Sequence, residues 1–427
     1  RGVCVVSRRC GGRRAQCPPM TQHVVIAGGG IGGLACALAL ARAGVSVDLL
    51  EQAGALGEVG AGLQLGPNAV RVLDEWGLMA PLHARAAFPE DLRVRDAHGG
   101  QTLGLLRLGA VIRARYGQPY ATIHRADLHG LLLDAVQRHS GVRVHLGARV
   151  ATYESTASSV HVTCEDDSLF QGAALIGADG LWSRVRTQLL GAHPVRLSGH
   201  LAYRGMVLAE RVPAALRSSG VVAWLGPRLH VVQYPVKRGN WFNVVAVVHG
   251  VLGAGHGGPP GSDPQSWSHE ARWNDLQRAL GPVCPDLQAM LAAVGEWKLW
   301  ALNDRPPMAG AHEQAQGRVA LLGDAAHPLR PYLAQGAAMA IEDAWTLGRL
   351  VQGQRDLGAD HWPELLQRYA RTRWARNAMV QNRSARNGTI FHASGALRLA
   401  RNAAMAILGE SLLDNPWLYS GPPEPVV

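Results

Sequence analysis

The chain has 427 residues, of which 47% are hydrophobic and 17% charged, a balance typical of globular proteins and unlike that of disordered or fibrous ones. Because one hydrophobic core stops growing at roughly 250–300 residues, we expect two intertwined domains with additional helices. The formal net charge is +10, but the arginines are not interleaved with aromatic residues and the apolar runs are too short to cross a bilayer, so we expect neither a nucleic-acid partner nor a membrane.

The first nineteen residues differ from the rest of the chain. They are rich in arginine and cysteine and contain no acidic residue, and Met20 is a natural start. We interpret residues 1–19 as an extension that is disordered or a misassigned start, with a transit peptide as the alternative. The remaining cysteines, Cys36, Cys164 and Cys284, are single and widely spaced. Without a CxxC pair we expect no metal site, and a reducing, cytoplasmic location is the simplest.

Residues 23–51 carry a dinucleotide-binding fingerprint. A short apolar run precedes Gly28-x-Gly30-x-x-Gly33, a helix rich in alanine and leucine follows, and a second apolar run ends at Glu51. Gly28 permits the tight turn, Gly30 lets a pyrophosphate approach the backbone, and Gly33 lets helix and strand pack closely. The diphosphate would lie at the helix N-terminus, and Glu51 would accept hydrogen bonds from the ribose hydroxyls. An acid at this position suits FAD or NAD.

Two later segments combine an apolar run with a polar turn and a helix. "IHRADLHGLLLDAV" places Arg125 just ahead of a helix with apolar residues at helical spacing. "ALIGADGLWSRVRTQ" ends an apolar strand at Asp179-Gly180, before another helix starts. Together they favour a ligand that several distant turns contact.

The middle of the chain predicts a mostly antiparallel sheet. Residues 202–207 and 223–248 show apolar residues at period two and a composition rich in β-formers. His230 and Tyr234 are four residues apart, so both side chains point to the same face of a strand. From these residues alone, a hydrogen-bonded sheet histidine and a core tyrosine remain the alternative to a site.

Residues 317–336 read "GRVALLGDAAHPLRPYLAQG" and end an apolar strand on a carboxylate. A nicotinamide dehydrogenase would normally need nothing from so distant a strand, whereas an extended flavin needs groups for its ribityl chain. Asp324 can accept a hydrogen bond from a ribityl hydroxyl, and a helix starting near Gly336 would direct its positive end at the flavin pyrimidine ring. The alternative is that Asp324 only caps the following turn.

The region from about 360 to 413 predicts helices with apolar residues on one side and many arginines on the other. We expect the apolar side to pack on the protein itself, with a contact in a homodimer as the alternative. The protein is expected to be a monomer or a homodimer.

Taken together, these motifs resemble the single-component, FAD-dependent aromatic hydroxylases of the para-hydroxybenzoate hydroxylase superfamily. The resemblance runs from about Thr21 to Trp417 and is carried by "GGGIGG" with Glu51, "EVGAGLQLGPNA", "HRADL", "GADGLWSRVR" and "GDAAHPLRPYLAQGAAMAIEDA". The most similar members are salicylate hydroxylase-like and 3-hydroxybenzoate 6-hydroxylase-like enzymes and 6-hydroxynicotinate 3-monooxygenase-like enzymes.

The resemblance implies an α/β fold, α+β overall, in which a Rossmann-like FAD-binding domain is intertwined with a mostly antiparallel β-sheet substrate domain and followed by C-terminal helices. We expect the FAD-binding domain to comprise residues 20–90, 115–199 and 300–359. The substrate domain would comprise residues 91–114 and 200–299, and the C-terminal helical region residues 360–427.

The resemblance also implies the chemistry. NADH or NADPH would reduce a tightly but non-covalently bound FAD, O2 would add at the flavin C4a position, and the hydroperoxide would hydroxylate an activated ring. The protein would supply binding, orientation and exclusion of water. By motif, the cofactor-binding residues would be Gly28, Gly30, Gly33, Glu51, Ala61, Gly62, Arg125, Asp179, Gly180, Asp324 and Gly336.

For the substrate, the resemblance implies a small aromatic or heteroaromatic hydroxy acid such as a hydroxybenzoate, salicylate or a hydroxynicotinate. His230 would accept the proton of the ring hydroxyl and Tyr234 would orient the ring, while Arg330 and Tyr332 are weaker candidates for substrate contact. One alternative is an epoxidase or monooxygenase acting on a larger polycyclic or quinolone substrate. A non-catalytic dinucleotide-binding protein is another.

Overall fold

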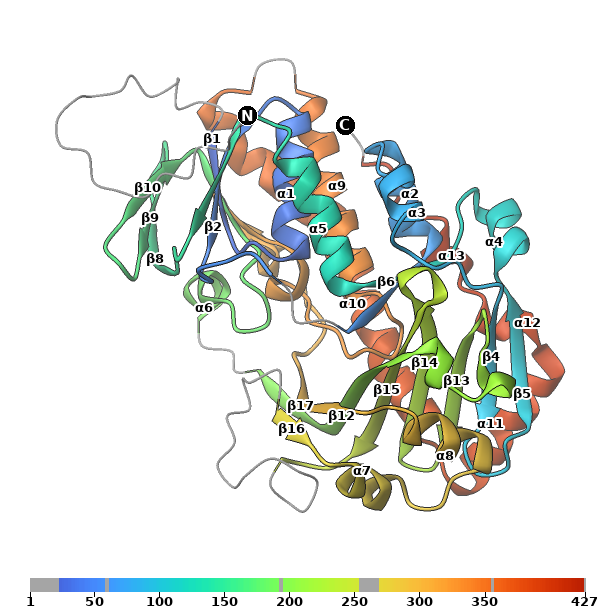
Figure 1. Cartoon of the computed structure of the whole chain (residues 1–427). Coiled ribbons are helices and arrows are strands. Elements are labelled where there is room, and N and C mark those ends of the chain that lie inside the picture. The colour runs from blue at the N-terminus through green and yellow to red at the C-terminus, as the bar shows by residue number, and fades with distance from the viewer. Residues whose placement is uncertain (1–22, 58–60, 192–194, 253–268, 355–356, 426–427) are drawn as a thin grey trace.

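A computed structural model describes residues 23–57, 61–191, 195–252, 269–354 and 357–425. Two large sheets lie beside each other, and helices cover both of them (Figure 1). The predicted mixed α/β fold is confirmed. The predicted extension, residues 1–19, lies outside the described residues.

The first large sheet has six strands in the order β18, β19, β11, β1, β2, β7. All neighbouring strands are parallel except β18 and β19, which are antiparallel. The strands are β1 (His23–Ala27), β2 (Ser46–Glu51), β7 (Val142–Leu146), β11 (Ala174–Gly177), β18 (Ala315–Gln316) and β19 (Val319–Leu321).

The two faces of this sheet are buried by different partners. Because side chains alternate along a strand, Val24 and Ile26 of β1 pack with the helices, whereas Val25 and Ala27 belong to a second core. The helices on the first face are α1 (Ile31–Arg42), α5 (Arg125–Val136) and α9 (Gly336–Gln352). The second core contains a three-stranded sheet and one helix, namely β8 (Val150–Ser155), β9 (Val160–Cys164), β10 (Leu169–Gly172) and α6 (Arg184–Leu190).

The second large sheet has eight strands in the order β16, β17, β12, β15, β14, β13, β4, β5. It is antiparallel except for the pair β13 and β4, as predicted for the middle of the chain. The strands are β4 (Asp91–Asp96), β5 (Thr102–Arg107), β12 (Arg196–Leu208), β13 (Val221–Gly226), β14 (Leu229–Val236), β15 (Trp241–His249), β16 (His269–Ala271) and β17 (Trp297–Asp304). Since β17 continues to Asp304, this sheet extends past the expected domain boundary at residue 300.

Strand β14 shows how this sheet separates a core from a site. Val231 packs with α7 (Trp273–Leu280) and α8 (Pro285–Ala292) on the outer face. His230 and Tyr234 have the opposite parity and point to the inner face, toward the six-stranded sheet.

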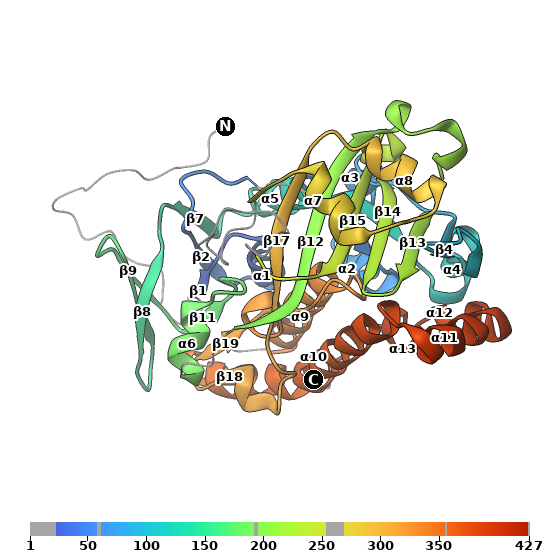
Figure 2. The ribbon, with the colours of Figure 1, turned by 90° about the horizontal axis from the view of Figure 1, so that it is seen from below.

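The remaining elements connect and flank the two sheets. A two-stranded ribbon of β3 (Gly62–Leu65) and β6 (Ala121–His124) lies between them. In the sequence, three helices lie between these two strands: α2 (Pro67–Glu75), α3 (Met79–His83) and α4 (Gly109–Tyr116). Figure 2 shows the C-terminal helices running along one side of the molecule; they are α10 (Trp362–Phe391), α11 (Gly395–Leu408), α12 (Glu410–Leu413) and α13 (Pro416–Tyr419). Within the described residues, no helix combines the length and apolar character needed to cross a bilayer.

Helix α10 packs on the protein as predicted, but not all its arginines face solvent. Arg373 is completely buried, and its guanidinium donates to Glu342 at 2.8 Å and to Asp343 at 2.7 Å, both on α9. Arg376 also donates to Glu342, at 2.7 Å. Buried ion pairs therefore join α10 to α9 in addition to apolar contacts.

Candidate active site

A cavity of about 340 Å3 lies between the two large sheets. It is bordered on one side by the N-terminal ends of α1, α5 and α9 and on the other by the inner face of β12, β14, β15 and β17. The predicted site residues that line it are Gly30, Ala61, Gly62, Arg125, Gly180, His230, Tyr234, Asp324, Arg330 and Gly336. The structure thus brings together in one cavity residues that are up to three hundred positions apart.

The glycine turn between β1 and α1 forms one end of the cavity. Gly28 has a φ of +103°, and a Cβ added to it would lie 2.4 Å from the carbonyl oxygen of Ala178. A Cβ on Gly33 would lie 1.8 Å from the carbonyl oxygen of Gly28. Neither position accepts a side chain, because each would collide with main-chain atoms. Glu51, at the end of β2, accepts a hydrogen bond from the Gly29 amide at 2.7 Å and lies beside this turn.

Two long helices begin at the cavity without a side-chain cap. Helix α1 starts after Gly30 and helix α9 after Gln335, and no side chain accepts a hydrogen bond from the first-turn amides of either helix among the described residues. Such free amides carry the positive end of the helix dipole. The cavity is therefore suited to an anionic or electron-rich ligand group at the N-terminus of α1 and at the N-terminus of α9.

Asp324 lines the same cavity as these helix ends and lies in the short 3-10 turn Gly323–Ala325 that follows β19. Its side chain is exposed to the cavity but enclosed by protein, and this desolvation raises the pKa of the carboxyl while the charge of Arg125 opposes the rise. No hydrogen bond from the part of the chain that the structure describes reaches this carboxylate. A carboxylate that faces a cavity without a partner is available for a ligand hydroxyl.

A buried polar network fixes the loop that carries Asp324. Asp343 of α9 accepts hydrogen bonds from the Gly323 amide at 3.1 Å and from His327 at 2.6 Å. Burial opposes ionisation of Asp343, but the charges of His327 and Arg373 outweigh it, so the pKa of Asp343 is lowered. The ionised Asp343 therefore holds both ends of the turn in which Asp324 lies.

The other predicted acid, Asp179, is already engaged. Its carboxylate accepts hydrogen bonds from the Ser183 hydroxyl and from the Arg184 and Val185 amides at the start of α6. Gly180, with a φ of +74°, borders the cavity in its place. Asp179 thus shapes the turn, and Gly180 is the residue of this pair that borders the cavity.

The ribbon strand β3 lies against Tyr234 of β14. The Gly62 amide donates to Asn243 at 2.7 Å, and a Cβ on Gly62 would lie 2.6 Å from the Tyr234 ring. The Ala61 carbonyl accepts from the Arg125 amide at 2.9 Å. Gly62 therefore allows the ribbon to lie directly on Tyr234 at the floor of the cavity.

His230 is 2% exposed, and its Nδ1 lies 2.7 Å from Nε2 of His392 at the end of α10. Burial and the neighbouring His200 lower the pKa of His230 to about 3. The imidazole is therefore neutral at ordinary pH, and its Nε2 remains for the cavity side.

Of the two weaker candidates for substrate contact, Arg330 borders the cavity and Tyr332 does not. Arg330 lines the cavity, and its Nε donates to Asp304 at 2.6 Å. Tyr332 is buried behind His230, with the two ring centroids 5.1 Å apart, and it is not among the residues that border the cavity. Arg204 of β12, which no motif singled out, also lines the cavity and stacks on Trp300 with its guanidinium carbon 4.2 Å from the ring centroid.

Comparison with known proteins identifies this arrangement. Residues 21–384 match the family described as "FAD binding domain". The chain is 39% identical over 385 residues to a 3-hydroxybenzoate 6-hydroxylase of Polaromonas naphthalenivorans, covering 90% of this chain and 92% of the relative. It is 33% identical over 332 residues to a 6-hydroxynicotinate 3-monooxygenase of Bordetella bronchiseptica, covering 77% and 82%. A salicylate hydroxylase solved as a substrate complex superposes with a TM-score of 0.78 at 27% identity, covering 94% of this chain and 96% of that one.

The chain belongs to the family of FAD-dependent aromatic hydroxylases.

The residues that line the cavity of this hydroxylase fit FAD. A dinucleotide requires an amide-rich turn for its diphosphate and acceptors for its hydroxyls. The uncapped α1 N-terminus and the unpartnered Asp324 carboxylate provide both in one cavity. Enzymes of this kind use NADH or NADPH and O2 as co-substrates.

Proposed function

We propose that this hydroxylase acts on a small aromatic acid that carries a ring hydroxyl, with a hydroxybenzoate as the first candidate. The observation that carries the proposal is that His230 and Tyr234 line the same cavity as Gly30 and Asp324. The residues that we assign to the substrate and those that we assign to the cofactor thus line one cavity. The names of the relatives, 3-hydroxybenzoate 6-hydroxylase and 6-hydroxynicotinate 3-monooxygenase, support an aromatic hydroxy acid.

For the cofactor, we assign the diphosphate to the N-terminus of α1 at Gly30 and the ribose to Glu51. The Asp324 carboxylate would accept a ribityl hydroxyl, with Arg125 nearby, and the N-terminus of α9 at Gly336 would face the pyrimidine ring. FAD, once bound, supplies the transfer of electrons from NADH or NADPH to O2 and of one oxygen atom to the ring. The protein's own task is to hold the ring in place and to exclude water.

For the substrate, we assign His230 Nε2 as the acceptor of the proton on the ring hydroxyl. Removal of that proton makes the ring oxygen a stronger electron donor to the carbon that is hydroxylated. Tyr234, whose hydroxyl has no hydrogen-bond partner among the described residues, would bind the ring hydroxyl or the carboxylate. Arg204 is the preferred partner for the substrate carboxylate, because its side chain lines the cavity from β12 and its charge lies near Tyr234.

The test is NADH and NADPH oxidation by the purified holoenzyme with a panel of hydroxybenzoates, salicylate and hydroxynicotinates, together with product analysis. We expect one acid to stimulate oxidation strongly and to yield hydroxylated product in equal amount. If none of them stimulates oxidation although FAD is bound, the proposed substrate class is wrong and larger aromatic substrates become the next candidates.

Replacing Asp324 by alanine is expected to weaken FAD binding about 10- to 150-fold, because a hydrogen bond to a charged group contributes about 1.5–3 kcal/mol. Since the carboxylate makes no hydrogen bond within the described protein, the apoprotein should unfold at the same or a higher temperature. FAD titration of the apoprotein and a thermal melt measure the two effects. Glu154→Ala, on an exposed position of β8, is the control; equal FAD affinity in both variants would contradict the assignment.

Replacing Arg204 by alanine is expected to raise KM for the aromatic acid about 10- to 100-fold, because a charge-assisted hydrogen bond is lost. Arg204 lies close enough to Tyr234 for its charge to oppose the burial that raises the pKa of that phenol. Arg204→Lys should recover part of the affinity, whereas Arg211→Ala, at an exposed position, should leave KM unchanged. An unchanged KM in Arg204→Ala, measured by steady-state kinetics, would exclude Arg204 as the carboxylate partner.

We also propose a cytoplasmic location and a monomeric or homodimeric state. The three described cysteines, Cys36, Cys164 and Cys284, are buried and unpaired, which suits a reducing compartment.

A further inference from the structure

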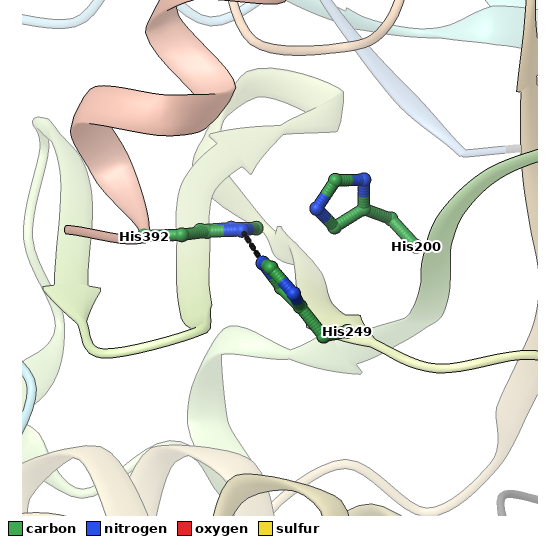
Figure 3. A group of neighbouring side chains, drawn as sticks. All are labelled: His200, His249 and His392. Atoms are coloured by element: carbon green, nitrogen blue, oxygen red, sulfur yellow. Dashed lines mark hydrogen bonds between the residues drawn. The ribbon is translucent and has the colours of Figure 1, made fainter. Parts of the chain in front are cut away.

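Behind the cavity, histidines from separate parts of the chain form a continuous line of hydrogen bonds. His230 Nδ1 lies 2.7 Å from His392 Nε2, and His392 Nδ1 lies 2.9 Å from His249 Nε2. Figure 3 shows the second of these bonds, with the ring of His200 beside it and not joined to it. His249 is only partly buried, so the line starts at the cavity and ends near the surface.

The main chain holds the last two rings in place. Arg228, in the turn between β13 and β14 with a φ of +61°, donates its amide to the His392 carbonyl at 3.1 Å. The Arg228 carbonyl accepts from the His249 amide at 3.2 Å. One turn thus ties the end of α10 to the end of β15, and the alignment of the rings does not depend on the side chains alone.

The rings are neutral, which is the state that a line of imidazoles needs to pass a proton on. Burial, reinforced by neighbouring histidines, lowers the pKa of His230 to about 3 and that of His392 to about 2. Each neutral ring has one N–H donor and one acceptor nitrogen. In a line, every ring can then accept at one nitrogen while it donates at the other.

We propose that His230, His392 and His249 form a relay that carries the proton of the substrate's ring hydroxyl from the cavity to solvent. The relay rests on the proposed function, because it needs a hydroxyl beside His230. It also explains how a buried histidine that does not retain a proton can still deprotonate a substrate, since the proton passes on rather than remaining on His230.

The substrate O–H bond breaks and a bond to His230 Nε2 forms, while the Nδ1–H of His230 passes to His392 Nε2. The Nδ1–H of His392 passes to His249 Nε2, and the Nδ1–H of His249 passes to water. One proton has left the cavity, the substrate is a phenolate, and each ring has exchanged its donor and acceptor nitrogens. The reverse sequence, as the product takes up a proton, restores the starting state.

A metal site is the competing use of these residues. His200, His249 and His392 offer nitrogen atoms that lie within 4.8 Å of one another. However, burial lowers the pKa of each of these three histidines, and nearby arginine charges lower it further. The arginines are Arg330 for His200, Arg228 for His249 and Arg401 for His392. A divalent cation would remain in that unfavourable potential, whereas a relayed proton only passes through it.

The test follows proton release when 3-hydroxybenzoate binds to the holoenzyme without NADH or NADPH, using stopped-flow with a pH-indicator dye. The phenolate absorbance of the ligand is recorded in parallel. We expect His249→Ala and His392→Gln to slow proton release at least tenfold, while the ligand Kd stays within twofold. Added imidazole should restore the rate in His249→Ala, whose site is partly open to solvent. His200→Ala, which alters a neighbouring ring outside the line, is the matched control and should release protons at the wild-type rate.

The other outcomes distinguish failure of the relay, failure of the proposed function and a metal site. Release within twofold of wild type in both relay variants would overturn the relay while the proposed function stands. If the wild type releases no proton and no hydroxy acid stimulates NADH or NADPH oxidation, the proposed function fails and the relay with it. If the wild type contains stoichiometric zinc, and His200→Ala loses both the zinc and the fast proton release, a metal site would replace the relay. If His392→Gln does not fold, His249→Ala and its rescue by imidazole decide the question.

Discussion

Replacing His230 by alanine is expected to slow hydroxylation about 10²- to 10⁴-fold with FAD still bound, which is the usual contribution of a positioned acid or base. The variant removes the acceptor nitrogen that faces the ring hydroxyl and disconnects His392 from the cavity. The substrate would then have to react largely in its protonated form. The loss should appear in kcat as well as in kcat/KM, because deprotonation assists the chemical step more than binding.

The measurement is the rate of product formation under saturating NADH or NADPH and substrate, with FAD content and circular dichroism recorded for each variant. His312→Ala, on an exposed position, should leave the rate unchanged. Because the pKa of His230 is lowered to about 3, its neutral accepting form is fully present from pH 5 upward. The wild-type pH profile above pH 5 should therefore show no ionisation of His230 itself. Turnover of His230→Ala within twofold of wild type would show that the assigned role is wrong.

Replacing Arg373 by methionine is expected to lower the free energy of unfolding by about 3–5 kcal/mol, the usual cost of removing one partner from a buried ion pair. Arg373 is fully buried and donates to Glu342 and Asp343, which are themselves fully buried. Without the guanidinium, both carboxylates remain in the interior, where Glu342 keeps its ion pair with Arg376 and Asp343 keeps its contact with His327. The shape of the side chain is largely kept, so the effect reports charge rather than a cavity.

Urea denaturation of the apoprotein measures this loss. Arg371→Met, two residues away on an exposed position of α10, is the matched control and should change stability by less than about 0.5 kcal/mol. Since Asp343 also fixes Gly323 and His327, the Arg373 variant should bind FAD more weakly even where it is folded. A loss of stability no larger than that of the control would show that the pair does not stabilise the fold.

Local patterns allowed many of the residues that line the cavity to be predicted. The glycine spacing that predicts the turn after β1 requires only neighbouring residues, and Gly28 and Gly33 lie where any side chain would collide with the backbone. Side chains alternate between the two faces of a strand, so His230 and Tyr234, four residues apart, were expected on the same face. Both line the cavity. These features are encoded within short segments, so a single sequence suffices to identify them.

Contacts between distant segments were not predictable in this way. His392 meets His230 across 162 positions of sequence. No periodicity indicates that a histidine at the end of a helix should face one in a sheet. Arg373 stands in a helix whose arginines suggest a solvent-facing side, and only the position of α9 shows that it is buried. A motif predicts that Asp179 contacts the cofactor, and only the three-dimensional structure shows that the α6 amides donate to its carboxylate.

The length of α10 has a consequence for recombination with related enzymes. This single helix runs from Trp362 to Phe391 and connects the ion pairs on α9 to His392 just beyond its end. A chimaera that takes its C-terminal region from a relative, joined near residue 360, would separate Arg373 from the carboxylates of α9 and His392 from the histidines of the sheet. A crossover that preserves both sets of contacts must transfer α9 and α10 together and match the residues of β14 and β15 as well. The C-terminal helices of this hydroxylase are therefore poor candidates for an exchangeable module, although they form a continuous stretch at the end of the chain.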